Sequence, residues 1–191
     1  MTTGFRSELA ARLAPIGAEA PGCAGAELRP AAVLVPLVER ARRVTVLLTQ
    51  RAEHLSHHAG QISFPGGRVE PRDRGAVDTA LRETEEEIGL DRAHIEVVGR
   101  LDIYETMTGF SITPVVGIVG EGFSLRIDGA EVREAFEVPL DFVLDPANHQ
   151  RHSREYDGAR RYYDAMPYRD RYIWGATAGM LVNLSRRLSR R

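Results

Sequence analysis

Runs of apolar residues separated by polar breaks mark the expected strands of this chain. Residues 31–38 and 44–49 are rich in valine and leucine, as buried strands are, and a mostly basic break separates them. Residues 97–104 and 112–119 form two further runs, with Thr108-Gly109 suited to the turn between them. The pattern therefore predicts four strands from these runs.

Three other segments space their apolar residues as amphipathic helices do. Residues 3–14 predict a short helix with Thr3 as its N-cap. Residues 74–88 predict a central helix. Residues 176–188 predict a closing helix whose basic end complements the helix dipole.

The central helix has a clear apolar stripe for the core. The stripe follows the spacing i, i+4, i+7 and i+11 and comprises Val77, Leu81, Thr84 and Ile88. Asp73 is expected to cap the start of the helix, and Gly89 to take the left-handed position past its end. The helix is thus expected to pack by one side and to offer another side to solvent or ligand.

The remaining segments complete the expected layers. Residues 15–30 are rich in proline and glycine and predict a loop. In residues 131–141 the proline at position 139 ends any strand and favours a new element. Residues 154–163 predict a hairpin around Asp157-Gly158. Strands on both sides of a central helix, with further strands and a terminal helix, predict an α+β domain in layers around a mixed central β-sheet.

Composition narrows the class of protein. With 191 residues we expect a single domain, 1–191, made of an N-terminal helix and loop (1–30) and a core (31–188). The net charge of -2 provides no general field for nucleic acid or an anionic membrane. The single cysteine, Cys23, excludes an intramolecular disulfide framework and suits a reducing cytoplasm. We therefore expect a cytoplasmic protein with neither a nucleic-acid nor a membrane partner.

Four glutamates crowd into five positions of the central helix: Glu83, Glu85, Glu86 and Glu87. At about 100° per residue, Glu86 and Glu87 share a face with Glu83, whereas Glu85 points elsewhere and is expected to be exposed. Like charges at this spacing repel, and oxygen ligands suit a hard cation such as Mg²⁺ or Mn²⁺. We expect Glu83 and Glu87 to bind the metal, and Glu86 to be a third ligand or the group that takes the proton from water.

Two neighbours of the glutamates add to this chemistry. Arg82 lies beside the ligand face and is expected to orient a carboxylate, either Asp78 at i−4 or Glu86 at i+4. Pro65-Gly66-Gly67 stands upstream, and backbone amides around Gly66 and Gly67 can approach a phosphate closely because glycine has no side chain. A carboxylate-held metal beside such a loop suits attack of water on a phosphoanhydride.

Residues 64–90 resemble the Nudix box. Residues 82–90 match its second half, Arg-Glu-apolar-x-Glu-Glu-x-Gly-apolar, with Thr84 in the apolar slot. In the first half, the box position for Glu falls on Asp73, and one additional residue precedes Arg82. The resemblance implies a Nudix-type α/β/α sandwich, Mg²⁺ or Mn²⁺ as cofactor, a small nucleotide substrate and a possible homodimer. It also implies a further acid from a downstream loop, for which Glu131 is the candidate.

The residues before the box resemble the coenzyme A pyrophosphatase branch of that superfamily. Its motif is Leu-Leu-Thr-x-Arg-(Ser/Ala), three residues, Arg, three residues, Gly, three residues, Phe-Pro-Gly-Gly. Residues 47–52, Gly60 and residues 64–67 match every spacing, and Ser56 replaces the second arginine. The resemblance implies hydrolysis of the pyrophosphate of coenzyme A or a derivative to 4′-phosphopantetheine and adenosine 3′,5′-bisphosphate.

In this interpretation Arg51 supplies the cation that the 3′-phosphate of coenzyme A requires. Phe64, Gly66 and Gly67 are the other expected substrate-binding residues. The loss of the arginine at Ser56 is expected to weaken coenzyme A binding without changing the chemical step.

Three rival functions remain open from the sequence. The nearest is a pyrophosphatase for ADP-ribose or another nucleoside diphosphate conjugate, which shares the box. An isomerase on the same fold would use a catalytic cysteine, and Cys23 lies outside any site-like context. A non-catalytic nucleotide sensor would not need the intact Arg82-Glu83 and Glu86-Glu87 pairs.

Overall fold

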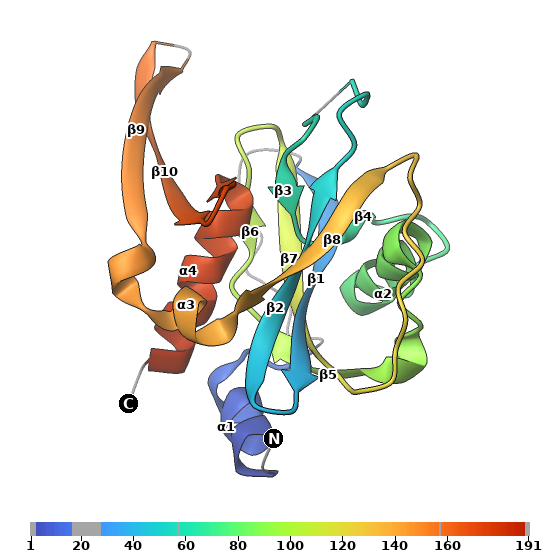
Figure 1. Ribbon diagram of the computed structural model, residues 1–191. Coiled ribbons are helices and arrows are strands. Elements are labelled where there is room, and N and C mark those ends of the chain that lie inside the picture. The colour runs from blue at the N-terminus through green and yellow to red at the C-terminus, as the bar shows by residue number, and fades with distance from the viewer. Residues whose placement is uncertain (1–2, 17–27, 57, 157, 190–191) are drawn as a thin grey trace.

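A mixed β-sheet forms the centre of the molecule in the computed structural model, which describes residues 3–16, 28–56, 58–156 and 158–189 (Figure 1). The path of this sheet is β3-β2-β1-β7-β5, and β4, β6 and β8 pair with β1, β7 and β2 respectively. Its strands are β1 (Arg29–Arg40), β2 (Arg43–Arg51), β3 (Ile62–Ser63), β4 (Gly66–Arg68), β5 (Ile95–Arg100), β6 (Tyr104–Glu105), β7 (Phe110–Val119) and β8 (Val132–Pro139). β1 and β7 run parallel while the other pairs are antiparallel, which confirms the predicted mixed sheet.

Helices cover both faces of this sheet (Figure 1). They are α1 (Thr3–Arg12), α2 (Ala76–Ile88), α3 (Leu140–Leu144) and α4 (Ala176–Ser189), with short 3₁₀ turns η1 (Arg92–His94) and η2 (Pro146–Asn148). α2 packs on one face against Leu34 and Val38 of β1, and α3 and α4 pack on the other face against Leu48 of β2 and Val35 of β1. The α+β sandwich is therefore the predicted fold.

A second, three-stranded sheet lies beside α4 in the order β11-β10-β9. Its strands are β9 (Gln150–Tyr156), β10 (Ala159–Tyr168) and β11 (Arg171–Trp174). The predicted hairpin is present and longer than expected, and Asp157 of its turn lies outside the described residues. Figure 1 shows β9 and β10 extending away from the central sheet.

Several element boundaries in the structure differ from the predicted ones. The predicted strand over residues 97–104 is wrong as one element, because β5 ends at Arg100 and β6 begins at Tyr104. A register shift precedes Gly99, and a Cβ on Gly99 would lie 2.6 Å from the Cβ of Leu13. The close approach of the α1 end thus bends this edge of the sheet.

The N-terminal prediction is tested only in part. α1 ends at Arg12 rather than at residue 14, because Ala14 forms a bridge with Arg100. Arg29 and Pro30 belong to β1 and not to the predicted loop. Residues 17–27 of that loop, including Cys23, and the side chain of Thr3 lie outside what the structure describes. None of the described helices is both long and apolar enough to cross a membrane.

Candidate active site

α2 positions the glutamates by packing its opposite side on the sheet. Thr84 and Ile88 of the predicted stripe are fully buried, whereas Val77 and Leu81 are half-buried and pack against the core around Ala80. Thr84 donates a hydrogen bond to the carbonyl of Ala80 at 2.6 Å. Gly89 ends the helix in the left-handed conformation, and its N–H donates to the carbonyl of Glu85 at 2.9 Å. The end of the helix is therefore as predicted.

The start of the helix differs from the prediction. α2 begins at Ala76 with Gly75 at the N-cap, and Asp73 does not cap it. Asp73 instead receives two hydrogen bonds from Arg82, at 2.9 and 3.0 Å, and one from the hydroxyl of Thr79 at 2.9 Å. The cap prediction was wrong because the Asp73 carboxylate accepts hydrogen bonds from the side chain of Arg82, two turns into the helix, and not from the backbone at the helix start.

Arg82 connects most of the acidic side chains of the site. Besides its contacts with Asp73, Arg82 Nη1 donates to Glu83 Oε1 at 2.9 Å and to Glu86 Oε2 at 2.8 Å. The predicted contact with Glu86 is present, whereas Asp78 pairs with Arg92 at 3.4 Å instead. Hydrogen bonds from Arg82 hold the pKa of Asp73 well below its usual range. In turn, hydrogen bonds to Asp73, Glu83 and Glu86 raise the pKa of Arg82.

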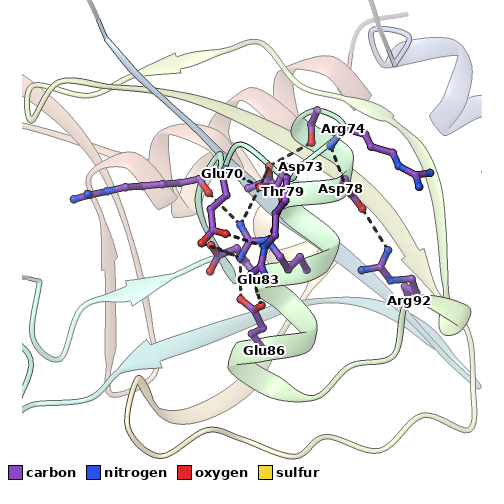
Figure 2. Close-up of polar contacts among 12 residues, drawn as sticks. Glu70, Asp73, Arg74, Asp78, Thr79, Glu83, Glu86 and Arg92 are labelled. Atoms are coloured by element: carbon purple, nitrogen blue, oxygen red, sulfur yellow. Dashed lines mark hydrogen bonds and ion pairs between the residues drawn. The ribbon is translucent and has the colours of Figure 1, made fainter.

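A tight turn from Glu70 to Asp73 precedes α2. The N–H of Asp73 donates to the carbonyl of Glu70 at 2.9 Å, and the N–H of Glu70 donates to the Asp73 carboxylate at 2.8 Å. This closed turn presents Asp73 to Arg82, as Figure 2 shows for the labelled Glu70 and Asp73 beside the helix. Asp73, which stands where the Nudix box has the longer glutamate, is thereby part of the carboxylate cluster.

The three glutamates expected on one face differ in burial. Glu86 is 51% exposed at its side chain, Glu83 18% and Glu87 5%. Burial raises the pKa of Glu83, and the hydrogen bond from Arg82 partly offsets this rise. Burial raises the pKa of Glu87 to about 8, against the opposing effects of the Gly66 N–H and Arg51.

The glycine loop fits closely around these carboxylates. The N–H of Gly66 donates to Glu87 Oε2 at 3.2 Å. A Cβ on Gly67 would lie 2.4 Å from Cδ of Glu83, and a Cβ on Gly66 would lie 2.4 Å from the carbonyl oxygen of Ala32. Phe64 is only 3% exposed within the core on the α4 side, so it supports the loop and presents almost no surface to a ligand.

Arg51 lies at the end of β2 and faces the same helix. Its Nη1 is 3.9 Å from Glu87 Oε1, and its Nε is buried without a hydrogen-bond partner in the described structure. The sequence did not indicate this contact, because it depends on how β2 and α2 pack. Arg51 therefore lies beside the Glu87 carboxylate. Ser56 is exposed in the loop that follows β2.

The two other predicted acids lie where the sequence placed them. Glu131 is exposed just before β8, and its charge contributes to raising the pKa of both Glu83 and Glu87, so it borders the same site. Glu85 is half exposed and lies 3.5 Å from Arg92, away from Arg82. Glu85 is thus outside the carboxylate group.

The chemistry of this donor set fits a divalent cation, although the side chains do not form a finished metal centre. Among the described residues, no three acidic, histidine or cysteine side chains converge closely enough to hold an ion as they stand. Two desolvated carboxylates with raised pKa values nevertheless gain most from a nearby cation. Arg82 holds Glu83 and Glu86, and Gly67 leaves the Glu83 carboxylate the space it needs.

An open recess lies on the other face of the sheet at the same end. Its volume is about 560 Å³, and its lining includes Gln50, Gln61, Tyr172 and Trp174. On β2, Leu48 packs in the core on the α4 side and Leu47 in the core on the α2 side, so Gln50, two residues after Leu48, belongs to the α4 face. The recess and the carboxylates are therefore separated by the thickness of one strand end.

Comparison with known proteins agrees with this geometry. The NUDIX domain family matches residues 28–158. The chain is 36% identical over 169 residues to a protein of Yersinia enterocolitica named "Uncharacterized Nudix hydrolase NudL", covering 88% of this chain and 86% of that protein. A protein of the same name from Yersinia pestis is 36% identical over 161 residues, covering 84% and 80%.

Solved structures show the same fold at lower identity. The Nudix hydrolase RenU of M. smegmatis has a TM-score of 0.52 at 24% identity, covering 59% of this chain and 71% of that chain. An Ap4A hydrolase of C. elegans has a TM-score of 0.51 at 20% identity, covering 58% and 80%. With the carboxylate helix and glycine loop in the arrangement described, the chain belongs to the Nudix family and is a Nudix hydrolase.

Proposed function

We propose that this protein hydrolyses the pyrophosphate bond of coenzyme A or one of its derivatives, releasing 4′-phosphopantetheine and adenosine 3′,5′-bisphosphate. Nudix hydrolases act on nucleoside diphosphate derivatives, and the finer substrate assignment is our proposal. The observation that carries it is the motif of residues 47–67, which keeps every spacing of the coenzyme A pyrophosphatase branch, with Ser56 in place of its second arginine. The placement of Arg51, Gly66 and Gly67 around Glu83 and Glu87 supports a role for that motif beside the reacting group.

The carboxylates supply the cofactor site in this proposal. Nudix hydrolases generally use divalent metals, and we assign Mg²⁺ or Mn²⁺ here to Glu83 and Glu87. Glu86 is either a third oxygen donor to the metal or the group that takes the proton from water. When bound, such a cation offsets phosphate charge and acidifies water. Arg82 is a positioning residue, because it fixes Glu83 and Glu86 through hydrogen bonds while Asp73 fixes Arg82.

The proton of the attacking water needs an acceptor that is open to solvent. Glu86 and Glu131 are the exposed acids at the site, whereas Glu87 is buried beneath the Gly66 amide. An acceptor must lie within hydrogen-bond reach of the attacking water. We therefore assign this role to Glu86 or Glu131 and not to Glu87.

We propose for Arg51 a different role from the one expected from the sequence. Its guanidinium lies 3.9 Å from Glu87, so a phosphate that contacts Arg51 lies beside the carboxylates. That position suits the diphosphate rather than the more distant 3′-phosphate. The recess of about 560 Å³ on the other face provides room for one of the two groups joined by the diphosphate.

A substrate panel tests the proposal. Purified protein is incubated with Mg²⁺ or Mn²⁺ and with coenzyme A, acetyl coenzyme A, oxidised coenzyme A, ADP-ribose and diadenosine tetraphosphate, and the products are identified by mass. We expect the highest kcat/KM for one of the coenzyme A substrates, with 4′-phosphopantetheine or its acyl or disulfide form as product. A higher value for ADP-ribose or diadenosine tetraphosphate would overturn the assignment.

A pyrophosphatase for ADP-ribose or another nucleoside diphosphate conjugate is the second candidate. Ser56 favours it, because the branch motif has an arginine there and this chain has a small neutral side chain exposed to solvent. The carboxylate site would serve both substrates equally well. The same panel distinguishes them.

A further inference from the structure

A pair of arginines shares one aromatic ring at the end of the sheet that carries the glycine loop. The guanidinium carbon of Arg29 lies 4.0 Å from the centre of the Phe110 ring, and that of Arg68 lies 5.4 Å from it. Arg29 and Arg68 are both exposed. A guanidinium that stacks on a ring keeps its N–H groups free at the edge for an anion.

The pairing of the strands fixes this cluster. Arg29 stands opposite Phe110 in the parallel pair of β1 and β7, and Arg68 stands opposite Ala31 in the antiparallel pair of β1 and β4. Opposed residues and residues two apart on one strand point to the same face, so the three side chains share a face. The sheet therefore brings Arg29, Arg68 and Phe110 together without a flexible loop.

The turn before β7 fixes the backbone of Phe110. The N–H of Phe110 donates to the hydroxyl of Thr106 at 3.0 Å, and the N–H of Thr106 donates to the carbonyl of Phe110 at 2.8 Å. Arg29 Nη2 donates to the carbonyl of Thr108 at 3.0 Å. The backbone that carries the ring and one guanidinium are thus both fixed before any ligand arrives.

These two arginines differ from the other cations near the site in having no acidic partner. Arg82 and Arg51 face the carboxylates of α2, Arg171 pairs with Glu134 at 2.5 Å, and Arg133 pairs with Glu53. Neither Arg29 nor Arg68 forms an ion pair with any carboxylate of the described residues. Their positive charge is therefore available to a ligand.

The cluster adjoins the reacting centre and lies on the other side of the glycine strand. Gly67 faces Glu83, and Arg68 is the next residue of β4, so its side chain leaves from the opposite face. A nucleotide whose diphosphate lies at Gly67 could extend past the strand end toward Arg68. An anionic group on its ribose would then meet both guanidiniums.

We propose that Arg29 and Arg68, stacked on Phe110, bind a phosphate monoester on the nucleoside half of the substrate, such as the 3′-phosphate of coenzyme A. This inference rests on the proposed function and assigns to these residues the role that the sequence gave to Arg51. The two guanidiniums discriminate coenzyme A from conjugates that lack the ribose phosphate. They do not take part in the chemical step.

Kinetics with a matched pair of substrates test this assignment. Wild type, Arg29→Gln, Arg68→Gln and Arg68→Lys are compared on coenzyme A and on 3′-dephospho-coenzyme A. We expect each glutamine variant to raise the KM for coenzyme A about tenfold, as the loss of a charge-assisted hydrogen bond predicts, with kcat and the KM for the dephospho substrate unchanged. Arg68→Lys keeps the charge and should retain part of the preference.

Arg42→Gln is the matched control, because Arg42 is exposed in the turn at the other end of β1. It should leave both KM values unchanged. Equal rises for the two substrates, or no change for either, would overturn the proposal. Melting temperatures accompany each variant, and Arg68→Gln is decisive if Arg29→Gln fails to fold, since only Arg29 hydrogen-bonds the turn.

A binding measurement separates this inference from the proposed function. Calorimetric titration of the metal-free protein with adenosine 3′,5′-bisphosphate and with AMP requires no turnover. We expect the bisphosphate to bind wild type at least tenfold more tightly than AMP, and the two glutamine variants to lose that difference. Equal affinities in wild type would refute the phosphate site, whereas a clear preference in a protein that does not hydrolyse coenzyme A would refute only the proposed reaction.

Discussion

At the scale of single residues, Arg82 is the side chain that connects the carboxylates of the site. It is 12% exposed and contacts Asp73, Glu83 and Glu86 at 2.8 to 3.0 Å. Exposed ion pairs contribute little to stability, but a two-point contact between a buried arginine and a buried carboxylate fixes geometry. We infer that Asp73 positions Arg82 and that Arg82 in turn positions the two glutamates.

The variant Asp73→Asn tests that chain of contacts. The amide keeps the shape of the side chain but loses the charge that holds Arg82, so we expect kcat to fall about 10- to 100-fold with little change in KM. Steady-state kinetics measure both constants. Asp78→Asn is the control, because Asp78 lies on α2 with Arg82 but pairs with Arg92 instead. It should stay within about twofold of wild type. Equal effects of the two substitutions would remove the special role of Asp73.

The same contact predicts a dependence of stability on pH. Because Arg82 lowers the pKa of Asp73 in the folded protein, the pair stabilises the fold above the unfolded pKa of about 4 and loses this contribution as the pH falls below it. Melting temperatures of metal-free wild type and Asp73→Asn should therefore differ at pH 6 and converge toward pH 2.5. A constant difference over that range would contradict the assignment.

At the scale of elements, the site is made where β4 passes the middle of α2. Two adjacent glycines perform different tasks there. Gly66 lies against the backbone of β1, and Gly67 lies against the end of the Glu83 side chain. A rigid neighbour resists an added methyl group, whereas a flexible side chain moves away from it.

Alanine at each glycine should separate stability from activity. Gly66→Ala forces β1 and β4 apart and is expected to destabilise the fold by about 1–3 kcal/mol. Gly67→Ala is expected to fold with nearly the wild-type melting temperature but to displace Glu83 and lose most turnover. Gly120→Ala is the control, since a Cβ there meets nothing within 4 Å. Thermal unfolding and kcat measured together check the contrast, and a Gly67→Ala enzyme with full activity would contradict it.

At the scale of the whole molecule, the sequence predicted the layers better than the contacts between them. Apolar runs located β1, β2 and β7, and helical spacing located α2 and α4. The short strands β3, β4 and β11 were not predicted, because two to four residues carry too little periodic pattern.

The same limit applies to the site. Helical geometry grouped Glu83, Glu86 and Glu87, but the depth of Glu87 depends on how closely α2 packs on the sheet. The contact between Arg51 and Glu87 joins residues of two elements, and the partner of Arg82 lies nine positions earlier in a turn. Local spacing therefore selected the side chains that we propose for the site, while tertiary packing determines which of them contact one another.

One measurement tests the central claim most directly: the rate of 4′-phosphopantetheine release from coenzyme A by wild type, Glu87→Gln and Glu85→Gln, with Mg²⁺ and with excess EDTA. Glutamine at position 87 keeps an oxygen for the Gly66 N–H, so the variant should fold, yet we expect roughly a hundredfold loss of rate. Glu85→Gln should retain the wild-type rate, because Glu85 lies away from the carboxylate group, and EDTA should abolish release by wild type. Release that survives EDTA, or a Glu87→Gln enzyme as active as wild type, would contradict the account.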